Sequence, residues 1–300
     1  MEASAPADPR TPRLASLGLI LAALFWGISY PLTKYVENCP TFYIIAVRFA
    51  IATVFLAVVC RRRFHLINRD TVRFALALSL CIAAMYVLNI VGIKYTTSVR
   101  ASFFTTLSYL IVPVLNYIFY RIRISSTIAV SAAICTVGML MLCYRPDMGN
   151  VHINIGDILC FLASVAGAVN IIFVEKISHH KNIDNSLFMV FMMAFVSCIG
   201  VVISLFRGEL TYTPAGPELA AIIVMGLFCS AGAFLLQIHC EAYVPSNRVG
   251  IIFSLEPASG CILSVLLIHE AMSLVGWAGA GVIMLSIFYL EYVNAKEADS

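Results

Sequence analysis

Charged residues are scarce in this chain of 300 residues. Only 12% of them are Asp, Glu, Lys or Arg, whereas 61% are hydrophobic, and the mean hydropathy is +0.94. A soluble domain carries about a quarter charged residues. One soluble core could not hide so much apolar surface from water, so lipid must surround most of the chain. The net charge of only +3, with basic residues spread between apolar segments, argues against nucleic-acid binding.

The sequence also lacks the residue patterns of metal sites and catalytic centres. Its ten cysteines occur singly, without a C-x-x-C pair, which is typical of small apolar helix residues. His269-Glu270 lacks the second histidine of an H-E-x-x-H zinc site. Neither paired carboxylates nor a nucleophile–base pair stands out. We therefore expect no cofactor and no metal, and we expect that the protein is not an enzyme.

What the sequence does contain is ten apolar segments of about 20 residues, the length that a helix needs to cross a bilayer. Charged and turn-forming clusters separate them, and the connections are too short for a soluble domain. No A-x-A-like cleavage site follows the first segment, which we interpret as a retained helix. The predicted spans are Leu14–Val36, Thr41–Cys60, Thr71–Lys94, Ser98–Tyr120, Ile124–Cys143, Ile155–Ile177, Asn185–Phe206, Pro217–Tyr243, Ser246–Ile268 and Ala271–Val293.

The basic residues in the short connections predict the orientation. With a cytoplasmic N-terminus, thirteen of the 19 lysines and arginines fall inside and five outside, and Arg48 lies within a helix. The cluster Arg61–Arg63 is the strongest anchor on the inner side. We therefore predict a multi-pass protein of the cell membrane, surrounded by lipid, with both termini in the cytoplasm.

An internal repeat divides the predicted helices into two sets of five. Shifted by 148 positions, the region after Tyr86 matches the region after Phe234 without a gap, and Asn89 falls on Gln237. Five is an odd number, so the two halves must have opposite orientations in the membrane. Secondary transporters commonly use such inverted repeats. The predicted all-α fold comprises a tail at residues 1–13 and repeats at residues 14–143 and 155–293.

Six short motifs resemble those of the EamA-type branch of the drug/metabolite transporter superfamily, in the same order and over nearly the whole chain. They are Phe25–Tyr30 (FWGISY) followed by Lys34, Arg48-Phe49, Gly92–Ser98 (GIKYTTS) running into Ala101–Phe103, Gly156-Asp157, Ser254–Pro257 (SLEP), and His269-Glu270. The chain departs from the family pattern at Tyr109, where a proline is common, at Ile122, where the family often has an acid, and at His269, which replaces a glycine. The resemblance implies ten transmembrane helices and the export of amino acids or related metabolites.

Polar side chains within membrane helices tend to face the interior of the bundle, because lipid offers them no partner. For isolated serines and threonines we favour interhelical hydrogen bonding over solute binding. We favour solute binding for Tyr86 with Asn89 and for Phe234 with Gln237, because a ring and an amide recur at equivalent positions. The predicted solute-binding residues are Trp26, Tyr30, Tyr86, Asn89, Thr105, Tyr109, Asn170, Phe234 and Gln237.

Four charged residues are candidates for gating or coupling. Glu256 precedes Pro257, which leaves a backbone carbonyl without its helical partner. Glu256 is either a proton site or a structural acceptor at this break, and we slightly favour the structural role. Arg48 either pairs with an acid or extends to the outer interface. Lys34 and Glu270, near the outer ends of their helices, are more plausible as gate or boundary contacts.

These features predict a secondary transporter that moves a small organic solute by alternating access. The family resemblance implies an amino acid or related metabolite as the substrate, and the aromatic residues favour an aromatic or apolar amino acid. The alternatives are efflux of amphipathic drugs and, from another class, a membrane enzyme or a non-transporting scaffold. The small-residue pairs Ala129/Ala133 and Gly276/Ala280 suit close helix packing, and a homodimer contact is the alternative.

Overall fold

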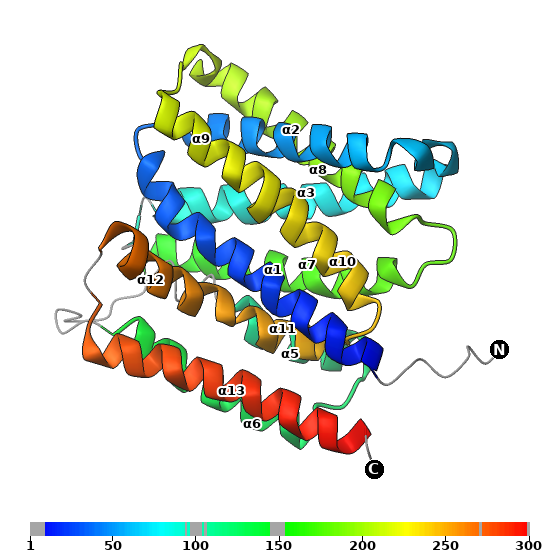
Figure 1. Cartoon of the computed structure of the whole chain (residues 1–300), viewed down its shortest axis with the longest axis vertical. Helices are drawn as coiled ribbons and strands as arrows, with labels where there is room; N and C mark the ends of the chain where they lie inside the picture. The colour runs from blue at the N-terminus through cyan, green and yellow to red at the C-terminus, as the bar shows by residue number, and fades with distance from the viewer. Residues whose placement is uncertain are drawn as a thin grey trace.

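The computed structural model describes residues 10–93, 95–96, 104, 107–144, 154–269 and 272–298, and this part of the chain is helical without a strand. The helices lie side by side and run across the longest axis of the molecule, and both termini lie at the same end of the bundle (Figure 1). The first half forms α1 (Arg10–Tyr35), α2 (Thr41–Val59), the 3₁₀ segment η1 (Arg61–Leu66), α3 (Arg69–Ile93), α5 (Ser108–Tyr120) and α6 (Ser126–Leu142). The second half forms α7 (Ile155–Ser178), α8 (Asn185–Phe206), η2 (Glu209–Thr211), α9 (Gly216–Val224), the π-helical η3 (Met225–Gly232), α10 (Ala233–Glu241), α11 (Ser246–Phe253), α12 (Leu255–Ile268) and α13 (Leu274–Ala298).

Most predicted spans correspond to helices that are long and apolar enough to cross a membrane. The described residues contain eight such spans, of which α9, η3 and α10 together form one and α11 with α12 another. Two shorter apolar helices, α5 and α6, lie within the predicted fourth and fifth spans. The predicted fourth span is Ser98–Tyr120, and most of its first nine residues lie outside the described part of the chain. The count of ten transmembrane helices therefore stays a prediction.

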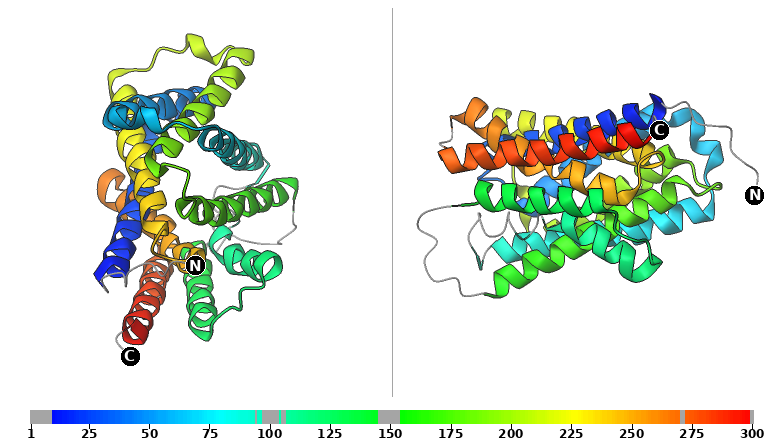
Figure 2. Two further views of the ribbon diagram at one scale, coloured as in Figure 1. Left: turned by 90° about the vertical axis from the view of Figure 1, so that its right-hand side faces the viewer. Right: turned by 90° about the horizontal axis from the view of Figure 1, so that it is seen from below.

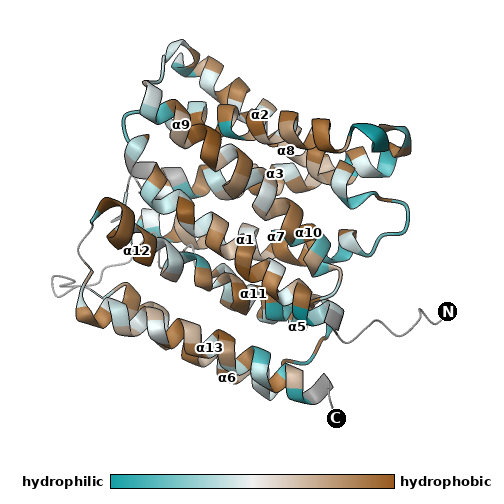
Figure 3. Cartoon of the chain, in the orientation of Figure 1, coloured by the Kyte–Doolittle hydropathy of each residue, from teal (hydrophilic) through white to brown (hydrophobic). Residues whose placement is uncertain are grey.

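The outer surface of the bundle is apolar. Hydrophobic residues follow the helices along their length, and hydrophilic residues gather at the ends and in the connections (Figure 3). Leu274, Phe206 and Phe288 expose 88%, 86% and 72% of their surface. Such exposure is unfavourable in water but not beside lipid tails, so the structure agrees with a multi-pass membrane protein.

Polar groups at the beginning of α7 hold it against the end of α3. The side chain of Asn154 accepts a hydrogen bond from the backbone N–H of Asp157, whose carboxylate accepts one from the N–H of Asn154, both at 3.0 Å. Asp157 also accepts from Thr96 Oγ1 at 2.6 Å. Gly156 permits the close approach, because a Cβ there would lie 2.6 Å from the carbonyl oxygen of Gly92.

Helix packing follows the same pattern in both halves of the chain. In the first half α1 packs against α12 and α10, and in the second half the corresponding helix, α7, packs against α5 and α3. The pairs α2 with α8 and α6 with α13 each join corresponding helices of the two halves. This pattern fits two repeats related by a two-fold axis.

Small residues bring α6 and α13 together, although not all at the predicted positions. A Cβ on Gly279 would lie 2.6 Å from the carbonyl oxygen of Gly138, so the two backbones are in contact there. The predicted pair on α13 is buried, but Ala129 and Ala133 are exposed on α6. The helix contact therefore uses another face of α6, because Gly138 lets α13 approach more closely than an alanine would. A homodimer stays a prediction.

The most basic connection lies at the end of the bundle that carries both termini. The cluster Arg61–Arg63 lies in η1, at this end (Figure 1). Arg63 forms a salt bridge of 2.9 Å with Asp184, which also caps the beginning of α8. The side chain of Asn68 donates to the carbonyl oxygen of Asn182 beside it. The termini and the basic cluster thus share one side, and its cytoplasmic location stays a prediction.

Candidate solute site

A cavity of about 140 Å³ lies where the two halves of the chain meet. Its walls come from α1, α10 and α12 on one flank and from α3, α5 and α7 on the other, with α11 between them. The left view of Figure 2, from the end of the bundle that carries the termini, shows the two flanks facing each other. Each flank contains helices of both halves, and the repeat relates one flank to the other: α1 corresponds to α7, α10 to α3 and α12 to α5. The predicted residues that line the cavity are Trp26, Tyr30, Tyr86, Tyr109, Asn170, Phe234, Gln237 and Glu256.

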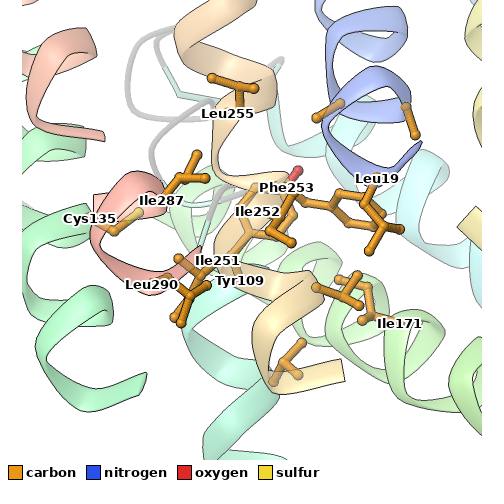
Figure 4. Close-up of a cluster of buried hydrophobic side chains, with 14 of the residues drawn as sticks. Leu19, Tyr109, Cys135, Ile171, Ile251, Ile252, Phe253, Leu255, Ile287 and Leu290 are labelled. Carbon is orange, nitrogen blue, oxygen red and sulfur yellow. The ribbon is translucent and has the colours of Figure 1, made fainter. Parts of the chain in front are cut away.

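Aromatic rings form a packed wall around Trp26. Its ring lies edge-to-face with those of Phe234 and Phe253, at centroid distances of 5.3 and 4.8 Å. Tyr109 continues the wall, 6.4 Å from Phe253, and Figure 4 shows both within a buried cluster that includes Ile252. Edge-to-face contacts fix the planes of the rings. The wall therefore offers a rigid apolar surface to a planar or branched part of a solute.

Two buried amides supply polar groups to this apolar surface. Asn170 is 6% exposed and Gln237 is 1% exposed, and both line the cavity. The Nδ2 group of Asn170 and the Oε1 atom of Gln237 have no hydrogen-bond partner in the described structure. Buried polar atoms are nearly always paired, so such atoms at a cavity point to a ligand. A solute that carries both an acceptor and a donor would satisfy both amides.

A hydrogen bond joins α5 to α12 beside the cavity. Tyr109 Oη donates to Glu256 Oε2 at 2.6 Å, and each of the two residues is the second of its helix. The predicted break before Pro257 is present, because α11 ends and α12 begins around Ser254. The hydroxyl of Ser254 donates to the carbonyl oxygen of Ile251 at 2.5 Å. Glu256 is thus an acceptor between two helices, and a proton-binding role for it stays a prediction.

Arg48 has partners that differ from both sequence-based alternatives. Its Nε donates to Ser230 Oγ at 2.6 Å and its Nη2 to the carbonyl oxygen of Cys229 at 3.0 Å. Both partners belong to η3, where the backbone follows the wider π-helical turn. The two acceptors that η3 presents match the forked guanidinium, and the acid partner and the interfacial position both stay predictions. Arg48 therefore fixes the helix segment that precedes Phe234 and Gln237.

Comparison with known proteins agrees with this architecture. A sequence model of the EamA-like transporter family matches residues 13–144 and again residues 154–292. The chain belongs to this family.

Relatives of this EamA-like chain include an uncharacterized transporter of Archaeoglobus fulgidus, 26% identical over 279 residues, with 91% of this chain and 84% of that protein covered. The uncharacterized transporter YetK of Bacillus subtilis is 24% identical over 296 residues, which cover 95% of this chain and 89% of YetK. A solved crystal structure superimposes with a TM-score of 0.82 at 14% identity, over 96% of this chain and 99% of the other. At that identity the likeness shows a shared fold alone.

Two glycines of this EamA-like transporter allow its cavity helices to approach one another. A Cβ on Gly27, within the motif that resembles the family's first helix, would collide with the hydroxyl of Ser259 on α12. A Cβ on Gly260 would lie 2.7 Å from the ring of Tyr30 on α1. Larger residues at either position would push α1 and α12 apart and displace Tyr30 from the cavity wall.

Some predicted site residues of this EamA-like chain are not placed at the cavity. Thr105 and Glu270 lie outside the described residues, as does the side chain of Lys34. Asn89 is half-buried on α3 and does not belong to the described cavity wall, although Tyr86 does. Its assignment as a solute-binding residue stays a prediction.

The sequence interpretation also missed several lining residues, among them Ser108, Ser164 and Phe253. The repeat contained a signal for the first, because Ser108 falls on Glu256 when the chain is shifted by 148 positions. Ser164 and Phe253 carry no comparable signal, since a single serine or phenylalanine in an apolar helix is common.

Proposed function

We propose that this EamA-like protein is a secondary transporter of a small organic solute, with an amino acid or related metabolite as substrate and export as its direction. The observation that supports the proposal is the cavity itself, where two buried amides, each with one unpaired atom, lie beside a packed aromatic wall. A free amino acid carries a carboxylate acceptor and an ammonium donor next to a side chain. The aromatic wall would hold an apolar or aromatic side chain, and the amides would orient the polar end.

The mechanism that we propose is alternating access through the exchange of shape between the two repeats. Corresponding helices form the two flanks of the cavity, so rocking one set against the other would open the cavity to one side and then to the other. The Tyr109–Glu256 hydrogen bond connects the flanks across the repeats, so its formation and loss would accompany this motion. Both termini would lie in the cytoplasm, because the basic η1 segment shares their side.

The test is counterflow in proteoliposomes that hold the purified protein. Vesicles are loaded with one unlabelled solute, and the entry of its labelled form is followed for phenylalanine, leucine, glutamate, lysine and a cationic amphipathic dye. We expect saturable counterflow of phenylalanine and leucine and little for the other solutes. Counterflow of the dye alone would favour drug efflux, and the absence of counterflow for every solute would contradict the proposal.

Two variants make this test specific for the cavity. Trp26→Ala removes the ring at the centre of the aromatic wall and should lower the apparent affinity for phenylalanine more than that for leucine. Asn294→Ala is the control, because this amide lies near the end of α13 and bonds to the carbonyl oxygen of Leu290 within its own helix. Equal effects of the two variants would show that the cavity is not the binding site.

A further inference from the structure

Glu241 is a fully buried carboxyl group that is not part of the proposed solute site and has no role in it so far. It is the last residue of α10 and is 0% exposed. Its Oε1 atom accepts a hydrogen bond from Gln237 Nε2 at 2.9 Å, and its Oε2 atom has no partner in the described structure. Since Gln237 Oε1 is also unpaired, the two side chains share one hydrogen bond and leave two oxygen atoms unsatisfied.

Within the described part of the chain, no basic side chain forms an ion pair with Glu241. α10 packs against α1, η3, α7 and α8. Among the described residues of these elements, the charged group that faces Glu241 is Glu175 of α7, which is itself acidic and only half-buried. On α10 itself, His239 is exposed and contacts Ser186 Oγ at 3.3 Å. A carboxylate within a helix bundle is costly without a counter-charge, so a cation must neutralise Glu241 for at least part of the time.

The available oxygen atoms favour a proton over a metal ion as this cation. Ca²⁺ and Mg²⁺, the cations that prefer oxygen ligands, take about six or more of them. Glu241 and Gln237 offer two unpaired oxygen atoms, and the described residues include no group of three His, Cys, Asp or Glu side chains that could hold a metal. A proton needs only the Oε2 atom of Glu241. The carboxyl group therefore fits a proton-binding site.

We propose that Glu241 binds and releases the proton that couples transport, and that Gln237 conveys its protonation state to the solute cavity. The proposal rests on the proposed function, because it assigns the coupling ion of the same transport site. The contact between the sites is direct: Gln237 lines the cavity and donates to the Glu241 carboxylate. No further residue is needed between the proton and the solute.

The hydrogen-bonding capacity of the amide explains how the proton would act. With Glu241 ionised, Gln237 must donate to it, which leaves the amide oxygen as the acceptor available to a solute. A proton on Oε2 turns that atom into a donor, so the amide can rotate, accept from the carboxyl group and present its N–H to the solute instead. For export, the proton would bind while the site is open to the side opposite the termini, and after the repeats exchange shape it would leave toward the side that carries the termini, where α10 ends.

Glu256 is the rival site for the coupling proton. It lines the cavity and already accepts a hydrogen bond from Tyr109. Glu241→Gln and Glu256→Gln both keep the size of the side chain and remove the titrating group. Comparing them in one assay therefore separates the two candidates, and Glu209→Gln, in a short segment between α8 and α9, serves as the control.

The experiment measures two activities in proteoliposomes with a solute that shows counterflow. One is exchange without a pH gradient, and the other is accumulation driven by a gradient of one pH unit, with an entrapped pH dye that reports proton movement. One coupled proton supports about tenfold accumulation under this gradient. We expect Glu241→Gln to keep exchange while losing both the accumulation and the dye response, and the control to keep all three.

Several results would overturn the proposal. Retained accumulation in Glu241→Gln, or its loss in Glu256→Gln alone, would remove Glu241 from coupling. Accumulation that requires sodium and not a pH gradient would identify a metal ion as the coupling ion. If Glu241→Gln does not fold, Glu241→Asp should keep coupling with a displaced pH midpoint, and an unchanged midpoint would also overturn the proposal. Wild-type exchange without any pH effect would refute this inference alone, whereas no exchange at all would refute the proposed function.

Discussion

Two buried asparagines allow the solute site to be tested separately from the stability of the bundle. Asn170 lines the cavity with an unpaired Nδ2 group, whereas Asn116 of α5 donates to Ser246 Oγ at 2.8 Å and to Asn247 Oδ1 at 2.6 Å. Both are almost fully buried, at 6% and 2% exposure. Replacing each with leucine keeps a similar volume and removes the amide. The same chemical change is thus made at a cavity position and at an interhelical contact.

The two changes should have opposite effects. In Asn170→Leu the protein loses an amide that is already unpaired on its Nδ2 side, so its stability should be unchanged or slightly higher. A bound solute would lose one hydrogen bond in a dry cavity, worth about 1 kcal/mol, so the apparent affinity should fall about fivefold or more. In Asn116→Leu the loss of two interhelical bonds should lower stability by about 1–2 kcal/mol and leave affinity unchanged.

The assay combines concentration-dependent counterflow with thermal unfolding in detergent, each followed for both variants and the wild type. Stability is read from the temperature at which half of the protein no longer elutes as a monodisperse peak. The reasoning would be refuted if Asn170→Leu aggregated while its folded fraction transported with normal affinity. Asn170 would then be an interhelical contact of the same kind as Asn116.

The remaining predictions concern the contacts that hold the site and the orientation of the chain. Tyr109→Phe removes the donor to Glu256 and should lower thermal stability by about 1–3 kcal/mol, since it leaves the Glu256 oxygen without this partner; a stability equal to that of the wild type would show that the bond has little net strength. Arg48→Lys keeps the charge but loses the forked donor, so it should cost about 1 kcal/mol in the same assay, and an unaltered variant would contradict the role assigned in η3. Single cysteines in a Cys-free background should be labelled from outside at Gly208–Thr213 and shielded in intact cells at Ile177–Asn182, and the reverse pattern would defeat the proposed orientation.

The helix bounds could be predicted from the sequence because charged and turn-forming residues mark them clearly. The helix α8 has the predicted bounds Asn185–Phe206, and the other predicted ends are mostly within a few residues of those observed. The aromatic part of the cavity could also be predicted from the sequence, because Trp26 and Tyr86 stand out in apolar helices. Both residues line the cavity. Periodicity gives the face of a helix, and that was sufficient for these two rings.

The finer features of the site depend on geometry that periodicity does not encode. A π-helical turn shifts the backbone hydrogen bonds by one residue without a characteristic residue type, so neither η3 nor its contact with Arg48 could be predicted. Long-range pairs such as Tyr109 with Glu256 depend on the relative rotation of two helices, which one sequence does not determine.

The Tyr109–Glu256 hydrogen bond also bears on the energetics of the proposed transport cycle. When the chain is shifted by 148 positions, Ser108 corresponds to Glu256 and Tyr109 to Pro257, so the symmetry mate of this bond would join Pro257 to Ser108. Proline has no side-chain donor, and the mate therefore cannot form. If the repeats exchange shape during transport, the bond stabilises only one of the two states. At about 1–3 kcal/mol, one such bond biases the populations of the states by a factor of about 5 to 150. Under this proposed cycle, Tyr109 would favour the state that faces one side of the membrane over the other.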